Sequence, residues 1–391
     1  MSGARAWVFL VVILGAVAAW RFWPQEELLP ETPPIVTPPV VERGVRRTAA
    51  VTAPERVEDK WTQKNAEAIK LLNDGAFEEA VALFAECVVG DPTERVFQAN
   101  LAEALARLAR VEYEDVKTRP QAIEHLEQAV ELAPDRLDLV ELLARWKAEA
   151  EVEGDFWTDR SAHFRLSYDG DRGELLGRGY DLVLRTLEDA YAEFADLFDV
   201  RPAEGGESAI EVVLLRREEF SKLTGLGHWA GGAYDGRIRV PVTDLAKEER
   251  QLVRVLRHEL VHAFVQEAGG RGVVGWLNEG LAELLEVPAG ASRAAAIAEA
   301  RERAQFDQIP FRSLEELGGT LASLGSVEEI RGAYVQSLAF VGWLEHWYGE
   351  RVLFEMISGC REGASVQETF EARTRVHLEK AMEDLAQDLR R

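Results

Sequence analysis

The chain has 391 residues, which is long for a single domain, so two folded units with accessory segments are expected. Its formal net charge is -24. This acidic balance, without a basic stripe, argues against nucleic acid as a partner, because Lys and Arg contacts to phosphates dominate such binding. Cys87 and Cys360 are the only cysteines, so neither a disulfide framework nor a thiolate metal cluster is expected.

The N-terminal segment is uncharged and apolar from Ala6 to Trp20, and Arg5 precedes it. Ala16-Val17-Ala18 provides the small-x-small pattern that a signal peptidase could cut, while the aromatic residues around Arg21 resemble an interfacial belt. Residues 1–23 are therefore predicted to be a signal anchor or a signal peptide. The protein would be exported and held at the membrane by its N-terminus, or secreted or periplasmic if the segment is cleaved.

A proline-rich segment follows the apolar one and contains few aromatic residues. This composition cannot build a core and favours extended conformations. Residues 24–56 are therefore predicted to be a linker that separates the membrane segment from the folded units.

Residues 57–153 have helical apolar spacing that occurs twice. Ala122 follows Ala80, and Leu126 follows Phe84, at the same offset of 42 residues. With Pro92 after the first copy, this pattern resembles the tetratricopeptide signature, which implies a helical repeat domain. The repeats would form a docking surface for a peptide or a partner protein. The alternative is a helical spacer that packs on the next domain.

The pattern changes after residue 153 to a mixture of strands and helices. Strands are predicted at His163 to Tyr168 and at Ile210 to Leu215, with a helix over Glu174 to Phe198 between them. Arg237 to Val242 is another strand candidate, and Pro241 favours an edge position that could accept an extended peptide. An ordinary hairpin is the alternative. Residues 154–391 are therefore predicted to form an α+β domain.

The strongest chemical motif is His-Glu-x-x-His, at His258 to His262. A helix is predicted over Leu245 to Glu267, capped by Asp244, and in it the two histidines face the same way, one turn apart. Two imidazoles in this arrangement can share one Zn²⁺ ion, which needs a third protein ligand and an open position for water. Glu259 would lie beside the metal, where its carboxylate can take the proton of that water.

The HELVH segment is followed by WLNEGLAE, residues 276–283. Together these segments resemble the gluzincin metallopeptidases, and the order of repeats before a compact domain is similar to the bacterial peptidase MA-like group. The resemblance implies that Glu279 is the third zinc ligand. It also implies that Glu283 is a carboxylate that holds the free N–H of a ligand histidine, with a solvated helix residue as the alternative.

A second resemblance lies in the segment from Gly332 to Leu338. Gluzincins of the aminopeptidase type have a Tyr before a comparable helix, which implies that Tyr334 stabilises the oxyanion; a Tyr in a helical core is the competing interpretation. Gln336-Ser337 stands where those enzymes carry Lys-Gly. The chain also lacks their Gly-x-Met-Glu-Asn segment and has Gly231-Gly232-Ala233-Tyr234 at the comparable place, which favours an endopeptidase over an aminopeptidase.

The sequence therefore predicts an α+β, zincin-like metallopeptidase domain after an all-α, tetratricopeptide-like domain. Its expected function is zinc-dependent hydrolysis of peptide or protein substrates in the cell envelope. The alternative is a repeat-containing envelope scaffold or adaptor whose zincin-like domain is inactive.

Overall fold

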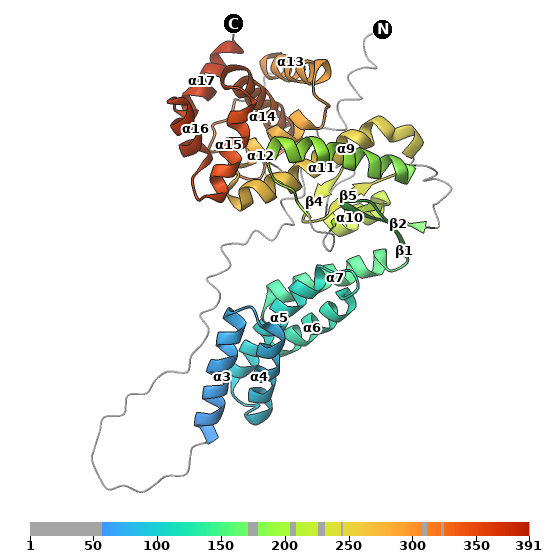
Figure 1. Ribbon diagram of the computed structural model, residues 1–391, viewed down its shortest axis with the longest axis vertical. Coiled ribbons are helices and arrows are strands. Elements are labelled where there is room, and N and C mark those ends of the chain that lie inside the picture. The colour runs from blue at the N-terminus through green and yellow to red at the C-terminus, as the bar shows by residue number, and fades with distance from the viewer. Residues whose placement is uncertain are drawn as a thin grey trace, which may run out of the picture. The chain divides into compact units, whose positions relative to one another are not determined.

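The computed structural model describes residues 57–170, 179–203, 209–225, 231–243, 245–306, 311–321 and 324–390. The predicted signal segment, the predicted linker and the proposed helix cap Asp244 lie outside these residues. Within them the chain forms two compact units, a helical unit at 57–152 and a mixed unit that begins at Glu153 (Figure 1). In this described part of the chain, no helix combines the length and apolar character needed to cross a membrane.

The helical unit consists of consecutive α-helices in which each of the first three packs on the next one. The residues that carry the repeated pattern are completely buried between them, with Ala80 and Phe84 in the first copy and Ala122 and Leu126 in the second. Small Ala side chains allow the helices to approach closely. The helices are α3 Val57–Asn73, α4 Phe77–Gly90, α5 Arg95–Tyr113, α6 Arg119–Leu132 and α7 Leu137–Glu153.

The mixed unit contains a five-stranded sheet in the order β1-β2-β3-β5-β4. The two outer pairs of strands are antiparallel, and the inner pairs β2/β3 and β3/β5 are parallel. The strands predicted from alternating and continuous apolar residues are present as β2 and β3. The strands are β1 Phe156–Arg160, β2 Phe164–Asp169, β3 Ile210–Leu215, β4 Ala233–Tyr234 and β5 Ile238–Pro241.

The expectation that Arg237 to Val242 forms an edge strand is wrong, because β5 lies between β3 and β4. The two-residue strand β4 is at the edge, and it forms a hairpin with β5. Pro241 is tolerated because β4 pairs only with Ile238 and Arg239, so no ladder hydrogen bond is required from Pro241 on that side. The proline therefore marks the place where β4 has ended, and not the edge of the whole sheet.

One face of the sheet is apolar and packs against two long helices, α9 and α11 (Figure 1). α9 contacts β2, whereas α11 contacts β4 and β5. The remaining helices continue the same core away from the sheet. The helices of this unit are α9 Gly179–Phe198, α10 Arg217–Thr224, α11 Leu245–Gly269, α12 Gly275–Leu285, α13 Ala291–Phe306, α14 Val327–Tyr348, α15 Glu350–Arg361, α16 Val366–Thr374 and α17 Leu378–Asp388, with a 3₁₀ turn at Gly270–Gly272.

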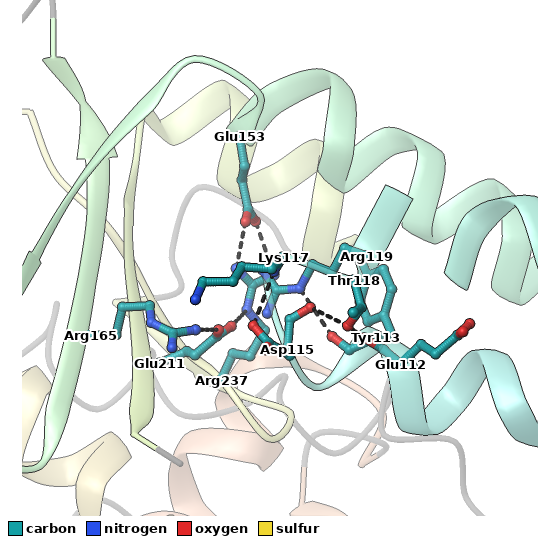
Figure 2. Close-up of polar contacts among 10 residues, drawn as sticks. All are labelled: Glu112, Tyr113, Asp115, Lys117, Thr118, Arg119, Glu153, Arg165, Glu211 and Arg237. Carbon is teal, nitrogen blue, oxygen red and sulfur yellow. Dashed lines mark hydrogen bonds and ion pairs between the residues drawn. The ribbon is translucent and has the colours of Figure 1, made fainter. Parts of the chain in front are cut away.

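The other face of the sheet carries paired charges. Figure 2 shows Arg237 between Glu153 and Glu211, with Arg165 also bound to Glu211. Because side chains alternate along a strand, Arg165 and Glu211 share a face opposite to the apolar residues next to them. The Arg165 and Glu211 side chains are almost fully buried, so each depends on its partner. This chain of ion pairs joins β2, β3 and the hairpin that carries β4.

Candidate metal centre

The candidate site is built on α11 and α12, which run antiparallel to each other. His262 on α11 contacts Asn278 near the start of α12, and Arg257 contacts Leu285 at its end. The helix expected over Leu245 to Glu267 is thus present as α11, and the turn after it returns the chain along its side. Glu279 lies in the second turn of α12.

The structure brings His258, His262 and Glu279 together. Glu279 Oε2 lies 3.6 Å from His258 Nε2 and 3.7 Å from His262 Nε2. One ligand atom from each of the three residues lies within 4.8 Å of the other two, and all three side chains are buried. The four-residue spacing on α11 places the two rings one above the other, and Glu279 approaches both from the neighbouring helix.

These three atoms have the arrangement that a tetrahedral cation requires. His258 Nε2, His262 Nε2 and Glu279 Oε2 are buried and form no hydrogen bond to the described residues. Buried polar atoms without partners are costly, so three that face one another fit a bound cation. Donors about 2.1 Å from Zn²⁺ at tetrahedral angles lie about 3.4 Å apart, close to the separations seen here. The residues therefore fit zinc.

The opposite nitrogen of each histidine is held by a residue in α12 or directly after it. His262 Nδ1 lies 3.0 Å from Asn278 Oδ1, and His258 Nδ1 lies 3.3 Å from Glu286 Oε2. Such contacts orient a ligand histidine and select the tautomer whose Nε2 is free to bind metal. Asn278 and Glu286 were missed by the sequence analysis. Their spacing from Glu279 could have identified them. Asn278 directly precedes Glu279, and Glu286 follows it by two helical turns, so helical periodicity places Glu286 on the same side as Glu279.

The role expected for Glu283 stays a prediction. A carboxylate oxygen of Glu283 lies within 4.8 Å of a ring nitrogen of His258, but the contact to His258 Nδ1 comes from Glu286 and the contact to His262 Nδ1 comes from Asn278. Glu283 is not a solvated helix residue, because its side chain is buried and its Oε1 has no partner among the described residues. Glu283 is one turn from Glu279 and Glu286 is almost two turns away, and both face α11. Only side-chain packing decides which of the two carboxylates contacts His258.

Glu259 belongs to α11 and lies next to the three candidate ligands. Its side chain is buried, and the residue is 1% exposed. Burial, together with the nearby charges of Glu279 and Glu286, raises the pKa of its carboxyl to about 8, although His258 acts in the opposite direction. The backbone before β4 packs directly against it. A Cβ atom at Gly232 would lie 2.7 Å from Glu259 Oε1, so no other residue fits there without a shift. The edge of the sheet thus reaches the candidate base.

Tyr334 belongs to α14, which packs closely on α12. A Cβ atom at Gly280 would lie 2.8 Å from the carbonyl oxygen of Ser337, which explains the glycine that follows Glu279. The Tyr334 hydroxyl is buried and has no hydrogen-bond partner among the described residues. Burial raises the pKa of this hydroxyl well above its usual value, and the charges of Glu279, Glu283 and Glu259 add to the effect. Tyr334 is therefore close to the candidate ligands and keeps its proton.

Gln336 and Ser337 have structural contacts. The Gln336 amide accepts a hydrogen bond from the backbone N–H of Arg312 at 2.9 Å and donates one to its carbonyl oxygen at 2.8 Å. The Ser337 hydroxyl donates to the carbonyl oxygen of Ala333 on the same helix. Gln336 thus fixes the segment around Arg312 to the helix that carries Tyr334.

The electrostatics of the site also favour a cation. Four carboxylates, those of Glu259, Glu279, Glu283 and Glu286, are buried close together. Burial lowers the pKa of both histidines, but in His258 the contacts with Glu279 and Glu286 outweigh burial and raise it. Carboxylates confined to a poorly solvated region repel one another, and a divalent cation between them reduces that cost.

Comparison of the chain with known proteins adds no assignment. No protein-family model matches it, and no curated protein matches its sequence. The interpretation of the site therefore depends on the geometry and on the motifs themselves.

Proposed function

We propose that this protein is a zinc-dependent peptidase of the gluzincin type. The observation that supports it best is that His258, His262 and Glu279 each direct one buried metal-binding atom toward the other two, and these atoms have no hydrogen-bond partner among the described residues. Glu259 lies beside them. A structural zinc site would use all four coordination positions on protein ligands, whereas three donors leave a position open for catalysis.

Bound Zn²⁺ would lower the pKa of a water molecule and polarise the scissile carbonyl group. Glu259 then accepts the proton of the attacking water and passes it to the leaving amine. Its position supports this role, because the carboxyl is buried directly beside the three residues that would hold the metal and its water. Tyr334 donates a hydrogen bond to the oxyanion, and its raised pKa keeps the donor proton in place.

The substrate is proposed to be an internal segment of a peptide or protein. An aminopeptidase needs an acidic group to hold the free amino terminus, and the segment Gly231-Gly232-Ala233-Tyr234 offers none. Gly232 packs so tightly against Glu259 that a longer side chain has no room there. This backbone belongs to the edge of the sheet, where an extended chain can pair with it.

Export to the cell envelope and anchoring through residues 1–23 remain part of the proposal and depend on the sequence of that segment. The helical unit is proposed to bind a protein partner or part of the substrate. Its consecutive packed helices support this, because stacked helical hairpins present an extended surface.

The proposal is tested on purified full-length protein by measuring zinc content and the digestion of a peptide library, with and without a chelator. We expect Glu259→Gln to retain zinc and lose about 10²–10⁴-fold in activity. We expect His262→Ala to lose both zinc and activity, since a ligand is removed. Zinc binding without turnover by the wild-type protein would favour the envelope scaffold with an inactive zincin-like domain. Full activity in Glu259→Gln would refute the assigned base.

A further inference from the structure

The mixed unit contains a groove between α13, α14 and the end of α17, and none of the candidate metal ligands lines it (Figure 1). Its volume is about 580 Å³, which is within the range of pockets that hold small ligands. Small residues keep it open, since Ala294 and Ala298 of α13 and Gly342 of α14 are part of its lining. A Cβ atom at Gly342 would lie 2.6 Å from Ile297 Cγ2, so the two helices also approach closely there.

The charged residues that line this groove are mostly acidic. Glu302 of α13, Glu345 of α14 and Asp388 of α17 each contribute a carboxylate. Among the described residues of the lining, Arg301 is the one side chain with a permanent positive charge. The Trp343 indole N–H donates a hydrogen bond to Asp388 Oδ2 at 2.9 Å, which connects α14 to the end of α17. The groove therefore has an excess of negative charge.

The positions of these carboxylates in their helices add to the negative potential. Glu345 lies in the last turn of α14, and Asp388 is the last residue of α17. Helix C-termini carry a partial negative charge, so a carboxylate there is unfavourable without a counter-charge. Burial raises the pKa of the Glu345 carboxyl and Glu350 adds to this effect, whereas Arg293 acts in the opposite direction. A bound cation would relieve this repulsion.

The geometry favours an organic cation over a metal ion. Among the described residues, every group that is close enough together to hold a metal ion includes His258, so the carboxylates of the groove are too far apart for that role. An exposed aromatic ring lies beside them, because Trp347 is 60% exposed and contacts His346 of the lining, with ring centroids 5.2 Å apart. An indole ring next to carboxylates suits a Lys or Arg side chain, since a cation–π contact adds to the ionic attraction.

We propose that this groove binds a basic segment of the protein substrate through its Lys and Arg side chains. The inference rests on the function proposed above, because it names the class of substrate. Glu345 lies about three helical turns after Tyr334 on α14, or about 17 Å along the helix axis. An extended chain spans this distance with about five residues, so one peptide is long enough to reach both the candidate centre and the groove.

The test measures the binding of short fluorescent peptides to full-length Glu259→Gln protein, which should not cleave them. One peptide contains an Arg-Arg pair, and the other has Glu-Glu at the same place. We expect only the Arg-Arg peptide to bind, with an affinity that falls as salt is added. In this background, Glu345→Gln/Asp388→Asn should weaken its binding by about tenfold. The matched control Glu328→Gln/Glu383→Gln, which removes two exposed carboxylates from the same two helices, should bind as before.

A second pair of variants tests the shape of the groove and leaves its charge unchanged. Ala298 lines the groove, whereas Ala295 lies on the same helix outside it. Both residues are exposed, so neither substitution should prevent folding. We expect Ala298→Trp to fill the groove and weaken the binding of the Arg-Arg peptide, and Ala295→Trp to have no effect.

The groove should also influence hydrolysis by protein that retains Glu259. For substrates with a basic segment, Glu345→Gln/Asp388→Asn should raise KM by about tenfold and leave kcat unchanged, because only binding outside the reacting centre is lost. For substrates without basic residues, both constants should stay the same. Steady-state kinetics on the two kinds of peptide provides the measurement.

Three results overturn the proposal. They are equal loss of binding in the two charge variants, unchanged binding in both Glu345→Gln/Asp388→Asn and Ala298→Trp, and equal binding of the Arg-Arg and Glu-Glu peptides. Failure of the proposed function would look different, because the wild-type protein would then bind the Arg-Arg peptide but neither bind zinc nor cleave peptides.

Discussion

The two units differ in whether their buried polar groups have hydrogen-bond partners. In the helical unit, Asn100 donates a buried hydrogen bond to Asn65 at 3.0 Å, and Tyr113 donates one to Glu149 at 2.6 Å. Among the described residues of this unit, Trp61 Nε1 is the one buried polar side-chain atom without a hydrogen-bond partner. Among the described residues of the mixed unit, some such atoms are scattered, for example Ser161 Oγ and Ser221 Oγ, but a group of them lies together around α11, α12 and α14. The atoms of this group belong to His258, Glu259, His262, Glu279, Glu283 and Tyr334.

This difference indicates that the core of the helical unit stabilises the fold, whereas the buried cluster of the mixed unit is suited to binding a ligand. Apolar burial with paired polar groups lowers the free energy of the folded chain by itself. A cluster of unpaired buried groups raises that free energy unless something absent from the protein chain binds there. The helical unit should therefore respond to loss of volume, and the site should respond to metal and to changes of charge.

The largest effect on stability is expected from Phe84→Ala in the helical unit. Phe84 is completely buried, and removing its ring should cost about 3–5 kcal/mol of the free energy of unfolding. Zinc affinity should be unchanged, because Phe84 lies in the other unit. Denaturant unfolding combined with zinc titration checks both statements. A weakened zinc site would show that the two cores are coupled.

Tyr334→Phe is expected to act on the chemistry alone. Removing the hydroxyl should lower kcat by about 10²–10³-fold, as loss of an oxyanion donor does, with little change in zinc content. The free energy of unfolding should not fall, because this hydroxyl has no hydrogen bond to lose among the described residues. Steady-state kinetics with metal analysis provides the measurement. An unchanged kcat would leave Tyr334 as a residue of the helical core.

Metal-free protein is expected to lose stability as the pH rises. The pKa of Glu259 is raised from 4.5 to about 8 in the folded protein. Between these values the unfolded chain binds fewer protons than the folded one, so the free energy of unfolding falls with increasing pH, by on the order of 2 kcal/mol. Chemical unfolding at pH 5 and pH 8 with chelator tests this.

The matched control for the pH experiment is Glu259→Gln, which removes the titrating carboxyl group. Its metal-free form should be more stable than the metal-free wild type at pH 8 and about equally stable at pH 5. An identical pH dependence in the two proteins would contradict the assignment of the effect to Glu259.

The smallest effect is expected from Gly280→Ala, which tests the contact between α12 and α14. The added methyl group would lie 2.6 Å from Val341 Cγ2, and the overpacking should cost about 1–2 kcal/mol. Because the shift would separate Glu279 from Tyr334, kcat should fall more than zinc affinity. Ala282→Gly, at another completely buried position of the same helix, is the control for changing one buried methyl group on α12. Equal changes in both variants would remove the special role of this glycine.

Much of the fold could be predicted from local pattern. The apolar runs of β2 and β3, the four-residue spacing of His258 and His262, and the repeated Ala and Phe positions all depend on neighbours in sequence, and the structure contains them. The position of β5 could not be predicted in this way. A proline in a strand is tolerated at the edge of a sheet and also where a short neighbouring strand has already ended, because in both places no hydrogen bond from its nitrogen is needed. The sequence around Pro241 therefore cannot distinguish the two cases.

The sequence by itself determined that a His-Glu-x-x-His helix is followed by a second helix with acidic residues on one face, because helical periodicity alone decides which residues share a side. Only the tertiary structure decided that Glu279 lies between the two histidines, that Glu286 and not Glu283 holds His258, and that Gly232 reaches Glu259. These facts depend on how closely helices and strands distant in sequence approach, and side-chain volume sets that distance.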